Sequence, residues 1–218
     1  MNAANTNAPK IESVILDYAG VMTVPISQAR RLPHAADVDR AALREVMGDV
    51  MGNPDPESVW SKLERGEMTI DAFIAQYEDR VRGIRTAFHP DSEFLFISNL
   101  EVRPEMVERV RLWRGRGIPV ALCTNNVAEW RPVWSNKLGG AESLFDVVVD
   151  SSAVGMRKPE SRIYEHTLAL LGASPATTLF VDDLAVNVEG ARAVGLHGVL
   201  ATDDSAHLAQ IDNLISRA

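Results

Sequence analysis

The stretch from Thr178 to Ala201 reads TLFVDDLAVNVEGARAVGLHGVLA and alternates between two apolar patterns. Residues 178–181 and 198–201 are short apolar runs, which are typical of strands buried on both faces in a parallel sheet. Residues 186–194 between them suit a helix that ends at Gly195. The stretch therefore predicts a strand, a helix and a second strand of the same sheet.

The same alternation extends over much of the chain. Short apolar runs predict further strands at residues 11–16, 118–123 and 145–149. One helix is expected to open at Arg103-Pro104, and another to span residues 160–171. The first of these helices is expected to direct one set of apolar residues inward: Met106, Val107, Val110 and Leu112. Strands that alternate with helices predict an α/β fold, a doubly wound parallel sheet with helices on both faces.

Residues 25–99 interrupt this alternation and carry helical signals without a convincing strand. The apolar residues of 39–51 fall on one helix face, a second segment begins at Asp55-Pro56, and Thr69 suits the N-cap of a third helix. We therefore expect a helical module inserted into the α/β fold. Residues 1–10 are polar and are expected to form a disordered tail.

The composition of the chain argues against nucleic acid and membranes as binding partners. The 218 residues are 46% hydrophobic with a formal net charge of −8, which excludes a wholly disordered chain and disfavours nucleic-acid binding. No apolar run approaches the roughly 18 residues of a membrane span, and the first ten residues lack the apolar core of a secretory signal. The single cysteine, Cys123, fits a reducing compartment. We expect a cytoplasmic protein that binds neither nucleic acid nor membranes.

Polar residues stand where four predicted strands end. Asp17 follows the first strand, Thr124-Asn125 the second and Asp182-Asp183 the fourth, while Lys158 lies in the loop after the third. Alone, each has an ordinary structural explanation as a helix cap or a solvated loop residue. Together they favour a site, because ligands of open parallel sheets bind at the carboxyl ends of the strands.

The chemistry of this set points to phosphoryl transfer or a related reaction. Clustered carboxylates repel one another unless a cation neutralises them, and hard oxygen ligands select Mg²⁺. Asp17 beside the metal suits a nucleophile that attacks phosphorus or carbon. Thr124 and Asn125 can donate hydrogen bonds to phosphoryl oxygens, and Lys158 can offset negative charge.

The chain resembles the haloacid dehalogenase-like hydrolase superfamily in four segments. They are LDYAGVMT (residues 16–23), LCTNN (122–126), GMRKPESRIY (155–164) and FVDDLAVNVEGARAVG (180–195). The sequences of these segments are most similar to the phosphatase-like N-terminal domain of soluble epoxide hydrolases and to free-standing bacterial relatives of that domain. The resemblance implies a Rossmann-like catalytic core (residues 11–24 and 100–218) and a helical cap (25–99).

The resemblance also implies roles for individual residues. Asp17 matches the nucleophile that forms an aspartyl-phosphate and ligates Mg²⁺, and Asp183 matches a second metal-ligating carboxylate. Thr124 matches the phosphate-binding threonine with Asn125 beside it, and Lys158 matches the lysine of the third motif, which is catalytic and binds substrate. Two residues match supporting positions, Asp182 and Asn187, the latter one helical turn after Asp183.

Ala19 departs from the phosphatase pattern, which has an aspartate there as general acid and base. Its backbone carbonyl can still contact the metal, but its side chain cannot protonate a leaving group. Four interpretations follow: a weak or specialised hydrolase of a small phosphorylated metabolite, a C–P hydrolase like phosphonoacetaldehyde hydrolase, a haloacid dehalogenase, or a non-catalytic phospholigand-binding or scaffold protein. A C–P hydrolase would need an amine from Lys62, the single lysine of the expected cap. A haloacid dehalogenase works without metal, which would leave the charges of Asp182-Asp183 unneutralised.

Aromatic residues offer weaker indications of substrate and partner. Phe73 and Tyr77 are expected in the core of the cap. Trp130 and Trp134 follow Thr124-Asn125 and are expected to contact either substrate or a second copy of the chain. Trp60 and Phe88 are further candidates for the pocket wall, whereas His89 before Pro90 is expected to lie in a surface loop. The oligomeric state is left open between monomer and homodimer.

Overall fold

The computed structural model describes residues 10–25, 38–51, 55–92, 96–202 and 206–216. Within these ranges the strands form one parallel sheet in the order β3-β2-β1-β4-β5. The strands are β1 (Ser13–Leu16), β2 (Val120–Thr124), β3 (Val147–Asp150), β4 (Thr178–Asp182) and β5 (His197–Leu200). The predicted doubly wound sheet is confirmed, with strand bounds shifted by a few residues.

The register of the central strands brings their carboxyl ends to one edge. Leu16 of β1 pairs with Leu122 of β2 and with Val181 of β4. The chain positions just beyond these pairs hold Asp17 and Asp182, and Thr124 lies at the end of β2. The sheet therefore delivers polar residues from three adjacent strands to the same edge.

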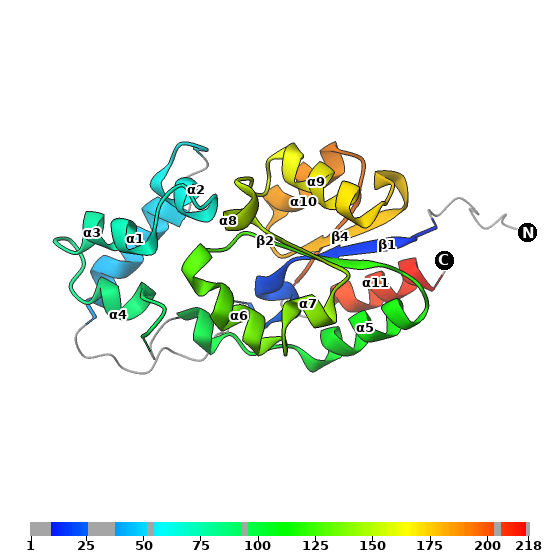
Figure 1. Cartoon of the computed structure of the whole chain (residues 1–218), viewed down its shortest axis with the longest axis horizontal. Coiled ribbons are helices and arrows are strands. Elements are labelled where there is room, and N and C mark those ends of the chain that lie inside the picture. The colour runs from blue at the N-terminus through cyan, green and yellow to red at the C-terminus, as the bar shows by residue number, and fades with distance from the viewer. Residues whose placement is uncertain (1–9, 26–37, 52–54, 93–95, 203–205, 217–218) are drawn as a thin grey trace, which may run out of the picture.

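Helices cover both faces of the sheet (Figure 1). Because successive strand residues point to opposite faces, Ile15 and Phe180 belong to one apolar cluster and Leu16 and Val181 to the other. The cluster with Ile15 includes residues of α9 (Ser161–Leu171) and α10 (Ala185–Ala193). The other includes residues of α5 (Pro104–Gly115) and α11 (Ala206–Ile215). Shorter helices complete the core: α6 (Arg131–Lys137), α7 (Ala141–Leu144) and α8 (Ser151–Val154).

A second group of helices follows β1 and lies at the end of the molecule opposite the two termini (Figure 1). It consists of α1 (Arg40–Met51), α2 (Val59–Glu64), α3 (Ile70–Tyr77), α4 (Ile84–Phe88) and the short helix η3 (Phe96–Asn99). We call α1–α4 the helical insertion. An antiparallel bridge between Thr23 and Val102 joins the segments on either side of it. The insertion thus leaves and rejoins the α/β core at neighbouring points.

Local sequence explains where the elements differ from expectation. Ser58 is the N-cap of α2, and the preceding Asp55-Pro56 lie in a turn in which Asp55 Oδ1 accepts a hydrogen bond from the Glu57 amide at 2.9 Å. The expected inward position of Leu112 is wrong. Leu112 is 51% exposed, and Trp113, the next residue of α5, is buried in its place. The sequence did not predict α6, α7 or α11. Of the predicted tail (residues 1–10), residues 1–9 lie outside the described ranges.

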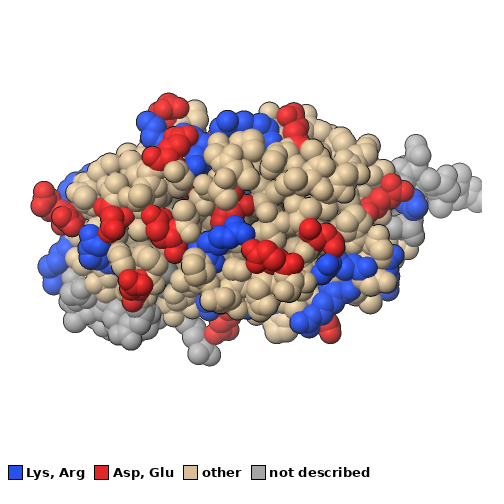
Figure 2. Space-filling model, in the orientation of Figure 1, with Lys and Arg blue, Asp and Glu red and all other residues tan. Residues whose placement is uncertain are grey.

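Figure 2 shows acidic and basic side chains interspersed over the face in view. The described residues include no helix that is both long enough and apolar enough to span a bilayer.

Candidate active site

Asp17 leaves the sheet in a tight turn at the end of β1. Its amide still donates to the carbonyl of Val181 at 3.0 Å, which keeps Asp17 in register with β4. The chain then enters the short helix η1 (Tyr18–Met22), where Gly20 has a φ of 74°. A Cβ at Gly20 would lie 2.3 Å from Oδ2 of Asp183. Glycine therefore permits both the left-handed backbone and the close approach of this carboxylate.

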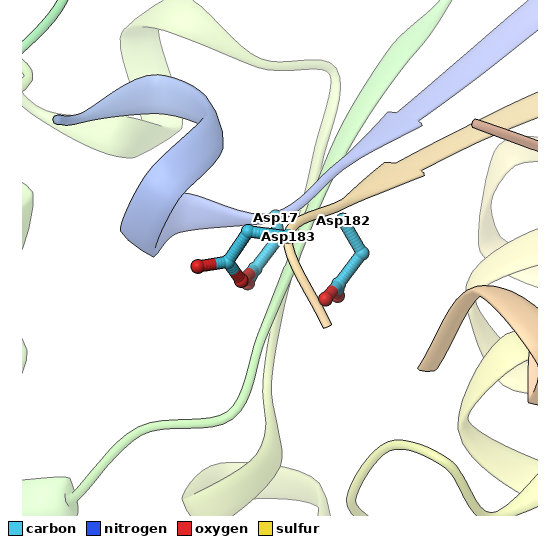
Figure 3. Close-up of side chains that lie close together, drawn as sticks. All are labelled: Asp17, Asp182 and Asp183. Atoms are coloured by element: carbon cyan, nitrogen blue, oxygen red, sulfur yellow. The ribbon is translucent and has the colours of Figure 1, made fainter. Parts of the chain in front are cut away.

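Three carboxylates gather at this edge of the sheet, as Figure 3 shows. One oxygen each of Asp17, Asp182 and Asp183 lies within 4.8 Å of the others. Asp17 and Asp182 are buried, and Asp183 is half-buried. The expected juxtaposition of the first acidic residue with the later acidic pair is thus present.

Lys158 bridges two of these carboxylates. Its Nζ lies 2.7 Å from Oδ1 of Asp17 and 2.6 Å from Oδ2 of Asp182, and its side chain is almost completely buried. Burial by itself lowers the pKa of the Lys158 ammonium, but the charges of Asp17 and Asp182 outweigh it and raise the pKa. Lys158 therefore carries a fixed positive charge against Asp17.

The pKa of Asp17 rises from its ordinary value of 3.8 to about 8 in the metal-free chain. Burial is the largest cause, and the negative charges of Asp182 and Asp183 add to it, while Lys158 opposes the rise. One ammonium thus does not compensate three neighbouring carboxyl groups. A further cation at this position would relieve the remaining repulsion.

The two consecutive aspartates occupy different surroundings. Asp182 Oδ1 accepts hydrogen bonds from the Leu184 amide at 2.9 Å and from Asn187 Nδ2 at 3.0 Å, and its Oδ2 contacts Lys158. Asp183 instead lines the cavity described below. Asp182 holds the ammonium in place and Asn187 fixes Asp182, whereas Asp183 lines the space in which a ligand would lie.

Thr124 and Asn125 end β2 beside Asp17. Thr124 is buried and lines the cavity with Asn125. The side chain of Asn125 is engaged with the backbone of Lys158, because its Oδ1 accepts from the Lys158 amide at 2.8 Å and its Nδ2 donates to the Lys158 carbonyl at 2.9 Å. The side chain of Asn125 thus holds the Lys158 loop, and its expected hydrogen bond to a phosphoryl oxygen stays a prediction.

The donor set fits a hard divalent cation. The carboxylates of Asp17 and Asp183 face one another across the cleft edge, and their oxygen atoms are the ligand type that Mg²⁺ prefers. Mg²⁺ needs few protein ligands, because water and substrate oxygens complete its shell. Two carboxylates are thus a sufficient protein contribution.

A cavity of about 570 Å³ opens above these residues, between the sheet edge and the helical insertion. Asp17, Ala19, Thr124, Lys158 and Asp183 line its floor. Its remaining wall is largely apolar and includes Met47, Trp60, Ile97, Leu100, Val127 and Trp130. A larger hollow of about 930 Å³ lies between α5 and α11 and includes none of the predicted site residues.

Glu64 and Arg157 also line the cavity, although the sequence did not single them out. Arg157 Nε donates to Oε2 of Glu64 at 2.6 Å, and Trp60 Nε1 donates to Oε1 at 2.9 Å. Burial raises the pKa of Glu64, although Arg157 opposes the rise. The sequence could have indicated Arg157, because it stands next to Lys158. No feature of the sequence around Glu64 indicates that it lines the cavity.

The remaining candidates, which are residues of the insertion and the tryptophans before and within α6, lie in different surroundings. Lys62 is partly exposed, pairs with Glu57 at 3.3 Å and does not line the cavity. Phe73 is buried in the core, as expected. The expected contact of Trp130 and Trp134 with a second copy is wrong, because both are buried within the chain. Trp130 lines the cavity, and its Nε1 donates to the carbonyl of Phe88 at 2.8 Å.

Residues 11–195 match the haloacid dehalogenase-like hydrolases as a family. The chain belongs to this family. The resemblance seen in the four sequence segments is thereby confirmed. The matched residues include both the α/β core and the helical insertion.

Curated relatives include phosphatases. The sesquiterpene phosphatase astK of Aspergillus oryzae is 31% identical over 168 residues, which cover 72% of this chain and 79% of that protein. The bifunctional epoxide hydrolase 2 of Rattus norvegicus is 24% identical over 210 residues, which cover 91% of this chain and 38% of that protein. The chain therefore spans well under half of the epoxide hydrolase, and this haloacid dehalogenase-like hydrolase is related to phosphatases.

A solved structure of a family enzyme from Bacteroides thetaiotaomicron, in complex with magnesium and inorganic phosphate, has a TM-score of 0.58. The alignment covers 91% of this chain and 98% of that chain, at 19% sequence identity. At this identity the likeness shows a shared fold, and the metal and phosphate are properties of that enzyme.

Proposed function

We propose that this haloacid dehalogenase-like hydrolase is a Mg²⁺-dependent phosphatase that acts on a small phosphorylated molecule through Asp17. The observation that carries the proposal is the buried contact of Lys158 Nζ with Asp17 Oδ1 at 2.7 Å, at the floor of a cavity that Asp183 also lines. Lys158 orients the Asp17 carboxyl group and favours its ionised, nucleophilic form. The relation to phosphatases supports the same reaction class.

In the first step, Asp17 attacks the phosphorus atom. A bond forms between the Asp17 oxygen and phosphorus, the bond from phosphorus to the ester oxygen breaks, and the leaving group departs with the electron pair as an anion that takes its proton from solvent. Mg²⁺ held by Asp17, Asp183 and the Ala19 carbonyl would neutralise charge on the phosphoryl oxygens. Water then attacks phosphorus, the bond from phosphorus to the Asp17 oxygen breaks, and inorganic phosphate leaves while the proton of the water passes to solvent. Asp17 is thereby restored.

The surrounding residues act by position and charge. Lys158 offsets the charge of Asp17 and of the transferred group, and the Thr124 hydroxyl donates to a phosphoryl oxygen. Asn125 fixes the Lys158 backbone, Asp182 fixes its ammonium, and Asn187 in turn holds Asp182. These contacts restrict Lys158 to the position in which it serves Asp17.

Ala19 sets a limit on the leaving group. General acid catalysis is typically worth about 10²–10⁴-fold, and the methyl group of Ala19 supplies no proton. Esters whose leaving group is a weak base therefore remain good substrates, and simple alkyl phosphates become poor ones. Acyl and aryl phosphates are accordingly the substrates of choice for a first assay.

Two alternatives make different demands on the structure. C–P bond cleavage through a Schiff base requires an amine in the cavity in addition to Lys158, and Lys62 does not line it. A non-catalytic phospholigand-binding protein is compatible with the loss of the acid at Ala19. It would retain phosphate binding without turnover.

The test is hydrolysis of p-nitrophenyl phosphate and acetyl phosphate with Mg²⁺, with Asp17→Asn and Lys62→Ala as variants. We expect turnover in the parent chain, no turnover above background in Asp17→Asn, and unchanged turnover in Lys62→Ala. Phosphate binding without hydrolysis of either compound would support the binding protein and contradict the phosphatase.

A further inference from the structure

The cavity wall contains a charged pair that the proposed reaction does not use. Among the described residues that line the cavity, Asp17, Lys158 and Asp183 belong to its floor, and the other charged side chains are Glu64 and Arg157. Glu64 is the last residue of α2 in the helical insertion. Arg157 lies in the core loop just before Lys158. The pair therefore joins the insertion to the core at the wall of the cavity.

Glu64 satisfies the guanidinium of Arg157 on the side that faces α2. Arg157 Nε donates to Glu64 Oε2 at 2.6 Å, and Arg157 Nη1 donates to Ser61 Oγ at 3.1 Å. The side chains of Glu64 and Arg157 are 10% and 15% exposed, so water screens this ion pair little.

The carboxylate of Glu64 is also fixed from its other sides. Trp60 Nε1 donates to Oε1 at 2.9 Å, and Asn125 Nδ2 approaches Oε2 at 3.5 Å. The same Asn125 amide holds the backbone of Lys158. Glu64 is thus a buried, oriented anion next to the cavity, and displacing it would leave several donors without an acceptor.

We propose that Glu64 determines substrate specificity by occupying the anion site that Arg157 would otherwise offer. This inference rests on the proposed phosphatase function and names the substrate class: phosphate monoesters whose leaving group is uncharged. A leaving group with a carboxylate or a second phosphate would meet Arg157 already paired and Glu64 at close range. Such a group would lose its hydration without gaining a partner.

The rest of the wall is consistent with this class. Met47, Ile97 and Leu100 present apolar side chains to the same space, and the indole of Trp60 points its N–H at Glu64. An uncharged leaving group can contact these residues without an unpaired charge.

The test compares two esters of the same shape, 4-carbamoylphenyl phosphate and 4-carboxyphenyl phosphate. They differ in the charge of one substituent and, to a smaller extent, in the basicity of the phenolate. The change of their kcat/KM ratio between variants cancels both this difference and general losses of catalysis. In the parent chain we expect the amide ester to be preferred by about 10- to 100-fold, the range that one hydrogen bond to a charged group supplies.

Glu64→Gln keeps the size of the side chain and an acceptor for Trp60, but it removes the charge that neutralises Arg157. We expect the ratio to fall by about tenfold or more, because the carboxylate ester gains Arg157 as a partner. The matched control is the double variant Glu64→Gln with Arg157→Gln, in which the preference for the amide ester should return.

Three results would overturn the inference: equal kcat/KM for the two esters in the parent chain, an unchanged ratio in Glu64→Gln, or a double variant that keeps the lowered ratio. The first comparison needs no variant, so it stands even if Glu64→Gln does not fold. If the parent chain hydrolyses neither ester, the phosphatase proposal fails. Calorimetric titration with the same two esters then tests whether the chain prefers the uncharged leaving group. Equal affinities for the two esters would contradict the proposed role of Glu64.

Discussion

Replacing Gly20 by alanine tests whether the turn after β1 sets the position of Asp183. Gly20 has a φ of 74°, in the left-handed region that costs an L-residue about 1–2 kcal/mol. The added Cβ would also lie 2.3 Å from Oδ2, 2.6 Å from Cγ and 2.8 Å from Cβ of Asp183. Rotation of the carboxylate alone cannot relieve a contact that includes its own Cβ, so the backbone near Asp183 has to move.

The expected loss of stability combines these two effects. Overpacking of a closely packed site costs about 1–3 kcal/mol, which together with the backbone strain gives roughly 2–5 kcal/mol. For a chain of this length about 1 kcal/mol corresponds to roughly 2–4 °C in Tm, so Tm should fall by about 4–20 °C. Because Asp183 is displaced, Mg²⁺ affinity should fall as well.

The measurements are thermal unfolding in EDTA and calorimetric titration with Mg²⁺. Gly115→Ala is the matched control, because Gly115 lies in α5 and a Cβ there meets nothing within 4 Å. Helical glycine costs about 0.5–1 kcal/mol relative to alanine, so the control should be neutral or slightly stabilised and bind Mg²⁺ normally. Wild-type stability and Mg²⁺ affinity in Gly20→Ala would refute the reasoning.

Two further predictions concern Ala19 and the charge of Asp17. Ala19→Asp should raise kcat for a simple alkyl phosphate by about tenfold or more, because it restores a proton donor, while Ala19→Asn should not. An alkyl phosphatase assay that shows no gain with aspartate would contradict this role. In the metal-free protein the pKa of Asp17 is raised from 3.8 to about 8, so the folded state binds more protons than the unfolded state between these values. The free energy of unfolding should therefore fall as pH rises from about 4 to 8, and Asp17→Asn should remove that part of the slope. Urea unfolding in EDTA at several pH values measures both slopes, and identical slopes would disprove the assignment.

The fold was predictable because its strongest signals are local. Buried parallel strands need apolar residues on both faces, so β1, β2 and β4 stand out as short apolar runs, and each is entirely buried. Leu112 shows where the pattern was misapplied. Counted from Met106 and Val110, the three- and four-residue spacing of a helix face leads to Trp113 and not to Leu112, and Trp113 is the buried residue.

The candidate site was predictable only as far as strand ends define it. Asp17, Thr124, Lys158 and Asp182 are marked by their position in the chain, because parallel strands end at a common edge. Glu64 carries no such mark, because its role depends on how α2 packs against the loop that holds Arg157. The orientation of Asn125 was likewise beyond local pattern, since its partners are backbone atoms 33 residues away.

The different surroundings of Asp182 and Asp183 follow from strand geometry. Side chains two positions apart in a strand share a face, so Asp17 continues the face of Ile15, and Asp182 that of Phe180. The ammonium of Lys158 lies on this same face, 5.7 Å from the ring centroid of Phe180 and within hydrogen-bonding distance of both aspartates. Asp183, one position later, leaves that face and reaches the cavity beside Gly20. The alternation that buries the strands therefore also divides the acidic pair, with the first carboxylate bound to Lys158 and the next lining the cavity.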